Sequence, residues 1–596
     1  AGQKAGCCGH TTVNGNVFMG MQAGKCAYNP VYNTFIGYSA GMGHADSTGG
    51  SGGSCNVAIG FHAAGNMRSG HNNVSIGIYT GVSDNNFAAG NFALACNLTG
   101  SNHIAIGKEA LSLTCTGGYN IALGNRSLYC NTTATFNIGI GYYTLLHNTT
   151  FGGSIAIGCK AGCCALCGPN IMIGEGTGMF LNGCHNTLLG TSAGTKATEA
   201  TGNTFIGRLS GGCNTTGSKN VSVGWNAGYG NTTGSGNINV GRESGALSCG
   251  ATGSANISMG QFSGKCISSA QCNISIGECA ACCLSTGGCN VAIGQNAGRG
   301  YNSGSINISI GQNSGAQSGN STGSGNISIG KVGQCISSGS ANIAIGCGVN
   351  MSTGNVTGDS NISIGPYAGR RLTSGGYNTF LGSSAGRYTT SGGRNQFIGI
   401  SAGSQNQTGC ENTAIGCAAG SRATSGNHNT SIGRAAGFNN VTGHGNVAVG
   451  HSAGYGNKGS NNISIGATAG PADSCTDNVD NILIGRQVGS SLTSGCSNIF
   501  MGVCAGVNAG TATSAIVIGN CAGKCFSPSL NTHGSGYGNI FVGEYAGKCV
   551  TTGIVNVLIG KCAGCCLHGS HTTIAIGANA GAKTCAANDN VFVGSS

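Results

Sequence analysis

The chain is poor in charge, in proline and in aromatic side chains, and these shortages exclude several classes of protein. Only 7% of its 596 residues are charged, 5 are proline and 6% are aromatic. The net charge of +11 comes from scattered basic residues, and the only adjacent pair is Arg370 and Arg371. A nucleic-acid-binding protein would be expected to cluster them, so no nucleic-acid partner is predicted. No apolar run approaches the ~20 residues that cross a bilayer, so membrane insertion is not expected.

Glycine, in contrast, is abundant, with 116 residues. It does not fall at every third position, which excludes collagen. So much glycine, together with many β-branched residues, also excludes long helices. Ile and Val recur in register along the chain, which argues against disorder. The composition therefore leaves β-structure with tight turns.

The glycines belong to a repeat with the pattern Asn-x-x-[Ile/Val]-Gly-x-x-[Ala/Ser]-Gly. If the first Gly of the pattern is taken as a landmark, 34 landmarks run from Gly20 to Gly594. Of the 33 spacings between them, 22 equal 17 residues. A fixed period of this size is the signature of a repeat architecture.

Positions within one repeat, numbered from its landmark Gly, indicate a short strand. Position −1 is Ile, Val, Leu or Met in 33 repeats, position −3 is mostly Ile, Val or Thr, and position −2 is small. This alternation has the period of a strand. We expect the apolar residues at −3 and −1 to point inward and the residue at −2 to point outward.

One repeat cannot bury its apolar residues alone, whereas stacked copies can. The sequence therefore predicts an all-β protein, a parallel β-solenoid (β-roll/β-helix) of about 34 coils with a 17-residue repeat. A triangular hexapeptide helix is the weaker alternative, because no six-residue subperiod is visible. The repeat pattern already holds at Ala5-Gly6 and still holds at Asn590–Gly594. We thus expect one continuous solenoid over residues 1–596, uncapped at both ends, as a section or subunit of a longer fibre.

Position −4 is Asn in 30 of the 34 repeats. Stacked Asn side chains can bond to one another in a ladder. Members of the predicted ladder are Asn256, Asn273, Asn290, Asn307, Asn412 and Asn429.

Segments such as Asn33–Gly41 and Asn412–Gly420 carry a resemblance to known fibres. They resemble the Asn-Thr-Ala-x-Gly repeats of phage tail-fibre proteins, and the head repeats of trimeric autotransporter adhesins. The resemblance implies a surface fibre, often a homotrimer. The coil is longer here than in adhesin heads, and the chain has far more cysteine.

The 34 cysteines often share columns of the repeat, and several pairs are one coil apart. Equivalent Cα atoms in stacked coils lie ~5 Å apart, within the 4.4–6.8 Å that a disulfide needs. Disulfides between coils would imply an oxidising compartment. The alternatives are small buried thiols and, as a weaker hypothesis, a zinc site at Cys562, Cys565, His568 and His571. The candidate disulfides are Cys266–Cys283, Cys272–Cys289, Cys504–Cys521 and Cys549–Cys566.

Other polar groups give weaker predictions. Asp473, Asp477 and Asp480 could hold calcium, although a solvated turn is the preferred interpretation. Carboxylates and histidines form no recurring catalytic constellation, so we expect no enzyme, no cofactor and no metal. If the producer glycosylates Asn-x-Ser/Thr, the sites expected to be accessible lie at position +7. These are Asn97, Asn131, Asn148, Asn214, Asn231, Asn406 and Asn440.

The leading hypothesis is a structural protein that forms an extracellular or virion-surface filament, stapled by disulfides. It would associate with itself, end to end or as a homotrimer. The alternative is a tail-fibre or adhesin shaft whose loops bind a host receptor or glycan. The longest insertions, residues 44–54 and 527–538, are the candidate loops for such contacts, although a tolerated surface loop is the simpler interpretation. Ice binding ranks last, because Thr is irregularly placed.

Overall fold

The structure is a computed structural model that describes residues 5–6, 14–27, 30–43, 53–65, 70–81, 83–317, 321–332, 337–349, 356–472, 478–526, 536–585 and 588–595. The chain divides into two compact units, Ala1–Asn296 and Ala297–Ser596. Within the described ranges, no helix has the length and apolar character needed to cross a bilayer.

The first unit holds the strands β1 to β17, each three residues long and each ending immediately before a landmark Gly. They are β1 Val17–Met19, β2 Thr34–Ile36, β3 Val57–Ile59, β4 Val74–Ile76, β5 Phe87–Ala89, β6 Ile104–Ile106, β7 Ile121–Leu123, β8 Ile138–Ile140, β9 Ile155–Ile157, β10 Ile171–Ile173, β11 Thr187–Leu189, β12 Thr204–Ile206, β13 Val221–Val223, β14 Ile238–Val240, β15 Ile257–Met259, β16 Ile274–Ile276 and β17 Val291–Ile293.

The second unit holds β18 to β34, built in the same way. They are β18 Ile308–Ile310, β19 Ile327–Ile329, β20 Ile343–Ile345, β21 Ile362–Ile364, β22 Thr379–Leu381, β23 Gln396–Ile398, β24 Thr413–Ile415, β25 Thr430–Ile432, β26 Val447–Val449, β27 Ile463–Ile465, β28 Ile482–Ile484, β29 Ile499–Met501, β30 Ile516–Ile518, β31 Ile540–Val542, β32 Val557–Ile559, β33 Ile574–Ile576 and β34 Val591–Val593.

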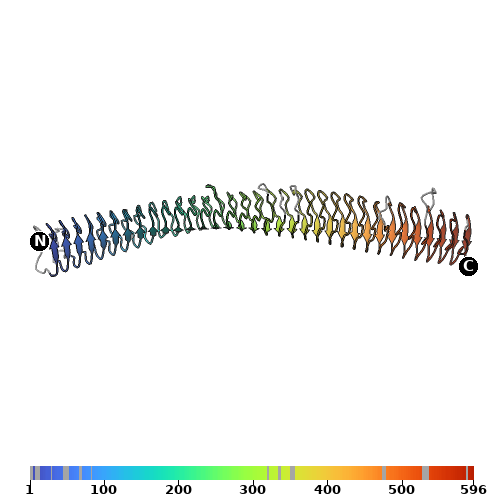
Figure 1. The fold of residues 1–596 in the computed structure, drawn as a ribbon, viewed down its shortest axis with the longest axis horizontal. Helices are drawn as coiled ribbons and strands as arrows, with labels where there is room; N and C mark the ends of the chain where they lie inside the picture. The colour runs from blue at the N-terminus through green and yellow to red at the C-terminus, as the bar shows by residue number, and fades with distance from the viewer. Residues whose placement is uncertain are drawn as a thin grey trace. The chain divides into compact units, whose positions relative to one another are not determined.

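Within each unit, every strand pairs in parallel with the next one along the chain (Figure 1). The register places equivalent repeat positions opposite each other, so that β15 and β16 pair Ile257 with Ile274 and Met259 with Ile276. Parallel strands need a long crossover, and the rest of each repeat supplies it by returning the chain to the next coil. The predicted fold, a parallel β-solenoid with a 17-residue repeat, is confirmed.

The predicted direction of the strand side chains is wrong. The residue at −2 points into the coil, as Ser275 does with no exposed surface, whereas the residues at −3 and −1 point outward. Met259 and Ile276, both at −1, are 40% and 36% exposed. The reason is the narrow interior: a Cβ on Gly264, on the opposite wall, would lie 2.5 Å from the Ser258 hydroxyl. Most side chains at −2 are therefore small or aromatic, and a few are larger aliphatic ones such as Leu188 and Leu483.

Glycine is favoured at two positions of the coil for different reasons, although Leu or Ala occupies +4 in several coils, as Leu128 does with a φ of 53°. At +4, Gly386 has a φ of +57°, and a Cβ there would lie 2.6 Å from the Phe380 ring inside the same coil. The landmark Gly382 has a φ of +131°, and its Cβ would lie 2.6 Å from the carbonyl oxygen of Gly399 in the next coil. Residues other than Gly rarely adopt these angles. Where position −2 is Phe, the rings stack between coils, as Phe380 and Phe397 do at 5.4 Å.

Two further corners of the coil place non-Gly residues in the left-handed region. They are positions +2 and −5, as in Ser384 with a φ of 59° and Tyr377 with a φ of 62°. Even the β-branched Ile306 and Val555 adopt this conformation, which is strained for such side chains. The sequence shows no marker for these corners, because very different residue types occupy them.

Candidate functional site

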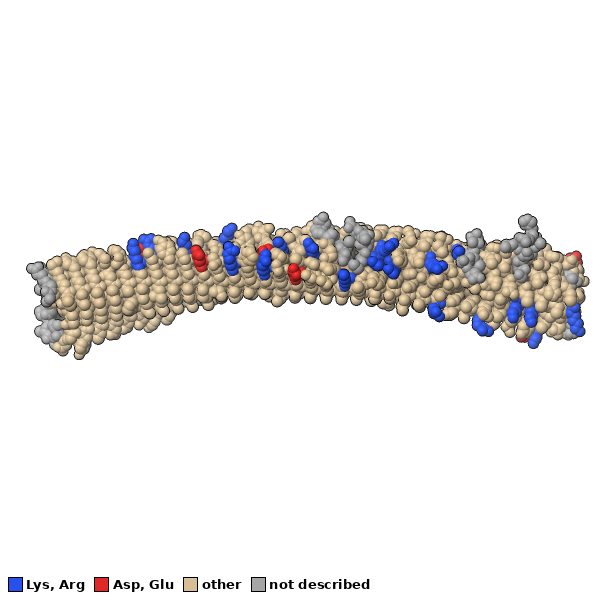
Figure 2. All heavy atoms as spheres, in the orientation of Figure 1, with Lys and Arg blue, Asp and Glu red and all other residues tan. Residues whose placement is uncertain are grey.

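The outward residues at −3 and −1 form a continuous apolar strip on each unit, which we call the apolar face. It comprises the first and third residues of every strand, and none of them is charged. Most are Ile, Val, Leu or Met, and all are exposed or half-buried. On the side of the molecule drawn in Figure 2, charged side chains form isolated groups between broad areas without charge. The apolar face is thus uncharged and repeats regularly along each unit.

The Asn residues at −4 lie inside the coil and form the ladder that the sequence suggests. The backbone N–H and the Nδ2 of Asn273 both donate to Oδ1 of Asn256, each at 3.0 Å. The same two contacts join Asn290 to Asn273 and Asn429 to Asn412. Asn307 accepts them from Asn326 in the next coil. All six predicted members are buried, so they hold coils together and face no ligand.

His103 replaces Asn in this ladder and keeps its hydrogen bonds. Its Nδ1 accepts from the backbone N–H of Asn120 at 3.2 Å, and its Nε2 lies 2.7 Å from the carbonyl oxygen of Gly117. The ring is therefore neutral, with its proton on Nε2. Burial lowers the pKa of His103 below its ordinary value of 6.5, although the two backbone hydrogen bonds act in the opposite direction.

The candidate glycosylation sites at +7 are buried, so the expectation that they are accessible is wrong. Each side-chain Nδ2, the atom that glycosylation would modify, donates to a backbone carbonyl three residues further on, as Asn214 does to Gly217 at 2.8 Å. An Asn side chain bent back in this way closes a local turn. The buried residues are Asn97, Asn131, Asn148, Asn214, Asn231, Asn406 and Asn440.

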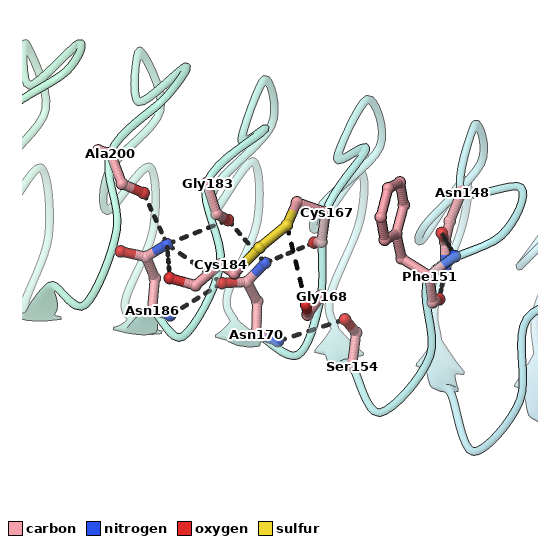
Figure 3. Close-up of a disulfide and its surroundings, with 10 residues drawn as sticks. All are labelled: Asn148, Phe151, Ser154, Cys167, Gly168, Asn170, Gly183, Cys184, Asn186 and Ala200. Atoms are coloured by element: carbon pink, nitrogen blue, oxygen red, sulfur yellow. Dashed lines mark hydrogen bonds between the residues drawn. A yellow bond between two sulfur atoms is a disulfide. The ribbon is translucent and has the colours of Figure 1, made fainter.

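Among the described residues of the first unit, two disulfides join coils, and neither is among the candidate pairs. Cys167 and Cys184 are 17 residues apart, with Cα atoms 5.4 Å apart, beside the ladder residues Asn170 and Asn186 (Figure 3). Their spacing equals the common 17-residue period, but the strands here pair with an offset of 16 residues, as Ile171 does with Thr187, so the two cysteines occupy neighbouring positions of the repeat. Cys213 and Cys249 are 36 residues apart, with Cα atoms at 5.8 Å, and each stands eleven residues before a landmark, Gly224 or Gly260. The eight candidates carry thiols: Cys266, Cys272, Cys283, Cys289, Cys504, Cys521, Cys549 and Cys566.

One cluster brings metal-binding side chains together. The ligand atoms of His147, Cys163 and Cys164 all lie within 4.8 Å of one another, and within the described ranges only this group does so. His147 is exposed and the two cysteines are half-buried. Burial, with the adjacent Cys164 thiol, raises the pKa of Cys163 to about 12, and the nearby Lys160 ammonium opposes this.

The sites suggested from the sequence for metal ions are not assembled in this way. Cys565 lies 3.9 Å from Cys566 (Sγ to Sγ), but Cys562, Cys565, His568 and His571 do not form such a group. Asp480 accepts a hydrogen bond from Asn461 at 3.1 Å. Asp473 and Asp477 lie outside the described residues, as does most of both long insertions.

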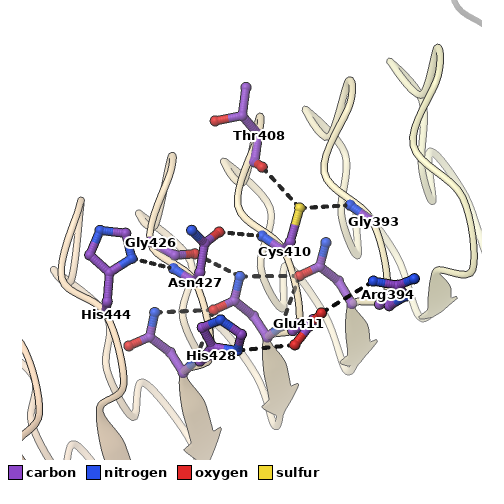
Figure 4. Close-up of polar contacts among 12 residues, drawn as sticks. Gly393, Arg394, Thr408, Cys410, Glu411, Gly426, Asn427, His428 and His444 are labelled. Atoms are coloured by element: carbon purple, nitrogen blue, oxygen red, sulfur yellow. Dashed lines mark hydrogen bonds and ion pairs between the residues drawn. The ribbon is translucent and has the colours of Figure 1, made fainter.

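A shallow depression of about 290 Å³ lies on the second unit. Tyr377, Asp359, Arg394 and Cys410 line it, and Tyr377 is 65% exposed. Arg394 pairs with Glu411 at 3.3 Å beside it (Figure 4). An exposed aromatic ring beside charged groups offers both stacking and hydrogen bonds to a polar ligand.

The scan against protein-family models found no match to this chain, and neither did the search of curated proteins.

Proposed function

We propose that this protein is a structural fibre protein that associates laterally with further copies of itself through the apolar face. The observation that supports this proposal is the outward row at −1, which is Ile, Val, Leu or Met in every described strand except β5, where it is Ala89. A soluble monomer rarely exposes a contiguous apolar patch larger than a few hundred Å². Such a face needs a partner, and catalysis is no part of the proposal.

The size of the face fits a stable interface. Strands about 4.8 Å apart, carrying two rows of side chains on a strip about 10 Å wide, give roughly 800 Å² for a unit of 17 strands. A specific protein interface of standard size covers about the same area on each partner. One unit therefore offers enough surface for a lasting contact.

A second copy of the chain is the partner that this face fits best. Its ridges repeat every ~4.8 Å along a nearly flat strip, and few partners present grooves with the same spacing. Another apolar face does so, and two such sheets pack about 10 Å apart with interdigitated side chains. The absence of charge from the face also means that like faces do not repel each other.

The disulfides support a location outside the reducing cytosol. The pairs Cys167–Cys184 and Cys213–Cys249 would persist in an oxidising compartment. An extracellular or virion-surface filament agrees with this chemistry, and the coil-to-coil hydrogen bonds would give it resistance to unfolding. The resemblance to phage and adhesin fibres points to the same location.

The experiment introduces charge into the apolar face without disturbing the coil. Met259→Lys combined with Ile276→Lys places two ammonium groups on exposed positions of adjacent strands. Wild-type chain should sediment as dimers or larger assemblies, and this variant should sediment as a monomer with unchanged circular dichroism. The matched control, Ser269→Lys with Thr286→Lys, adds the same charge at exposed positions outside the face.

The control variant should associate like the wild type. If the face variant still assembles with unchanged affinity, contact through the apolar face is refuted. Assembly that persists as end-to-end filaments in electron micrographs would then favour stacking of coils instead.

Glycan binding is a second candidate function, favoured by the depression around Tyr377. Its exposed ring would stack on a sugar face, while Arg394 and Asp359 would bond to hydroxyl groups. Full-length chain applied to a glycan array should show binding that Tyr377→Ala abolishes. Ser374→Ala, which removes a hydroxyl from the same depression, should weaken it far less.

A further inference from the structure

His147, Cys163 and Cys164 come from two successive coils of the first unit. The backbone N–H of His147 donates to the carbonyl oxygen of Cys163 at 3.0 Å, which fixes the two coils beside each other. Cys163 and Cys164 are neighbours in sequence, and their Sγ atoms lie 3.8 Å apart. Three groups that bind metals thus meet at one point of the surface.

The separation of the two sulfur atoms matches a tetrahedral zinc site. With Zn–S bonds of about 2.3 Å, the two sulfurs of a tetrahedron lie about 3.8 Å apart. A ring nitrogen of His147 lies within 4.8 Å of both sulfurs, so it can serve as the third ligand. Its exposure leaves the fourth corner open to water.

A disulfide is a poor alternative use for these thiols. Consecutive Cα atoms lie about 3.8 Å apart, below the 4.4 Å at which disulfide geometry becomes comfortable. In the coils before and after, the positions equivalent to Cys163 are Leu146 and Met179. The positions equivalent to Cys164 are His147 and Phe180. Neither thiol therefore has an in-register cysteine one coil away.

We propose that His147, Cys163 and Cys164 bind a thiophilic divalent cation, best represented by Zn²⁺, with water as the fourth ligand. Binding replaces the two thiol protons, which pass to solvent, and forms two Zn–S bonds and one Zn–N bond without a change of oxidation state. Calcium and magnesium prefer oxygen ligands, so thiolates and imidazole select against them. The ion would join two coils where no disulfide does.

The arrangement of two adjacent thiols recurs elsewhere in the chain. Cys282 lies 3.9 Å from Cys283, and Cys565 lies 3.9 Å from Cys566, in both cases Sγ to Sγ. In these coils the preceding repeat supplies a cysteine in place of histidine, Cys266 and Cys549 respectively. Only the group around Cys163 and Cys164 includes a histidine among these three. Replacing His147 therefore tests this group and leaves the other two thiol pairs unchanged.

The test uses the full-length chain, reduced and freed of metal, because its many thiols require a readout resolved by residue. Alkylation by iodoacetamide is followed by mass spectrometry of peptides, with and without one equivalent of Zn²⁺. Zinc should slow modification of Cys163 and Cys164 at least tenfold and leave Cys272 unaffected. In His147→Ala, this protection should be largely lost, and in the matched control His451→Ala it should remain.

Alkylation rates at Cys163 and Cys164 that do not respond to zinc would overturn the proposal. Equal protection in wild type and His147→Ala would overturn the role of the histidine. Because His147 is exposed, its replacement should leave the coil folded, which circular dichroism checks.

Discussion

The backbone N–H of Asn395 donates to Oδ1 of Asn378, one coil earlier, at 2.9 Å. The Nδ2 of Asn378 in turn donates to the carbonyl oxygen of Gly392 at 2.9 Å. One side chain therefore satisfies backbone groups at two places of the next coil. This relationship recurs along both units and fixes the register of the stack.

Asn378→Ala should loosen the coils around it. The substitution leaves the N–H of Asn395 and the carbonyl of Gly392 without these partners, at about 1–3 kcal/mol for each buried group. The local free energy of opening should fall by roughly 2–6 kcal/mol, measured by hydrogen exchange across residues 378–395. Ser374→Ala, at an exposed position nearby, should change it little. Unchanged protection in Asn378→Ala would show that the ladder is dispensable.

His103 should make the surrounding coils sensitive to acid. Burial lowers the pKa of His103 in the folded state, while the unfolded chain titrates near 6.5. As pH falls below about 6.5, the unfolded state binds more protons, so the free energy of unfolding decreases; above that pH the stability is fully present. Hydrogen exchange over residues 86–120, corrected for intrinsic rates, should reveal this loss.

The matched variant for this prediction is His103→Asn, which restores the usual residue of the ladder. It should remove the acid sensitivity and keep the hydrogen bonds between coils. An equal pH dependence in both proteins would assign the effect to other groups.

Val555→Asn should stabilise the second unit. Val555 has a φ of 54° at the −5 corner, a conformation that costs a β-branched residue about 1–2 kcal/mol, and Asn tolerates it better. The local free energy of opening should rise by about 1 kcal/mol. Leu113→Asn, at an exposed position outside the left-handed corners, should bring no gain. A loss of stability in Val555→Asn would contradict the left-handed backbone conformation assigned to this position.

Reduction of the Cys167–Cys184 disulfide should destabilise the coils that it joins. A disulfide that closes a loop of this size contributes about 3 kcal/mol through the unfolded state. Cys167→Ser with Cys184→Ser should therefore increase proteolysis around residues 167–184. Cys272→Ser with Cys289→Ser, which removes two thiols one coil apart, should leave proteolysis unchanged. If proteolysis increased in the Cys272→Ser, Cys289→Ser variant and not in the Cys167→Ser, Cys184→Ser variant, the stabilising role assigned to the Cys167–Cys184 disulfide would be wrong.

The period of the sequence was sufficient to predict the strands, because a landmark Gly follows each one and a Cβ there would strike the next coil. The Asn ladder followed in the same way, since a polar residue repeated at one position must bond to its copies or to the backbone. Both predictions depend on local chemistry repeated in register.

The direction of the side chains was not predictable from alternation alone. A period of two separates Ser275 from Ile276 but does not tell which side faces the interior. Hydrophobicity favoured the wrong side, because the space inside the coil decides which side chains fit there. The burial of Asn214 was not predictable for a similar reason. A polar residue in a loop is expected to face water, but this side chain is buried because it donates to a nearby backbone carbonyl. The cluster of His147 with Cys163 depends on the stacking of coils and has no linear motif.

The most direct test of this account compares two adjacent residues, Phe380→Lys and Leu381→Lys. Phe380 is fully buried at −2 and Leu381 is 43% exposed at −1. Hydrogen exchange across β21 to β23 should show a large loss of protection in Phe380→Lys and native protection in Leu381→Lys. If Leu381→Lys unfolds these coils while Phe380→Lys leaves them intact, the apolar rows lie inside the coil. The apolar face would then not be exposed, and the proposed lateral contact between copies would be refuted.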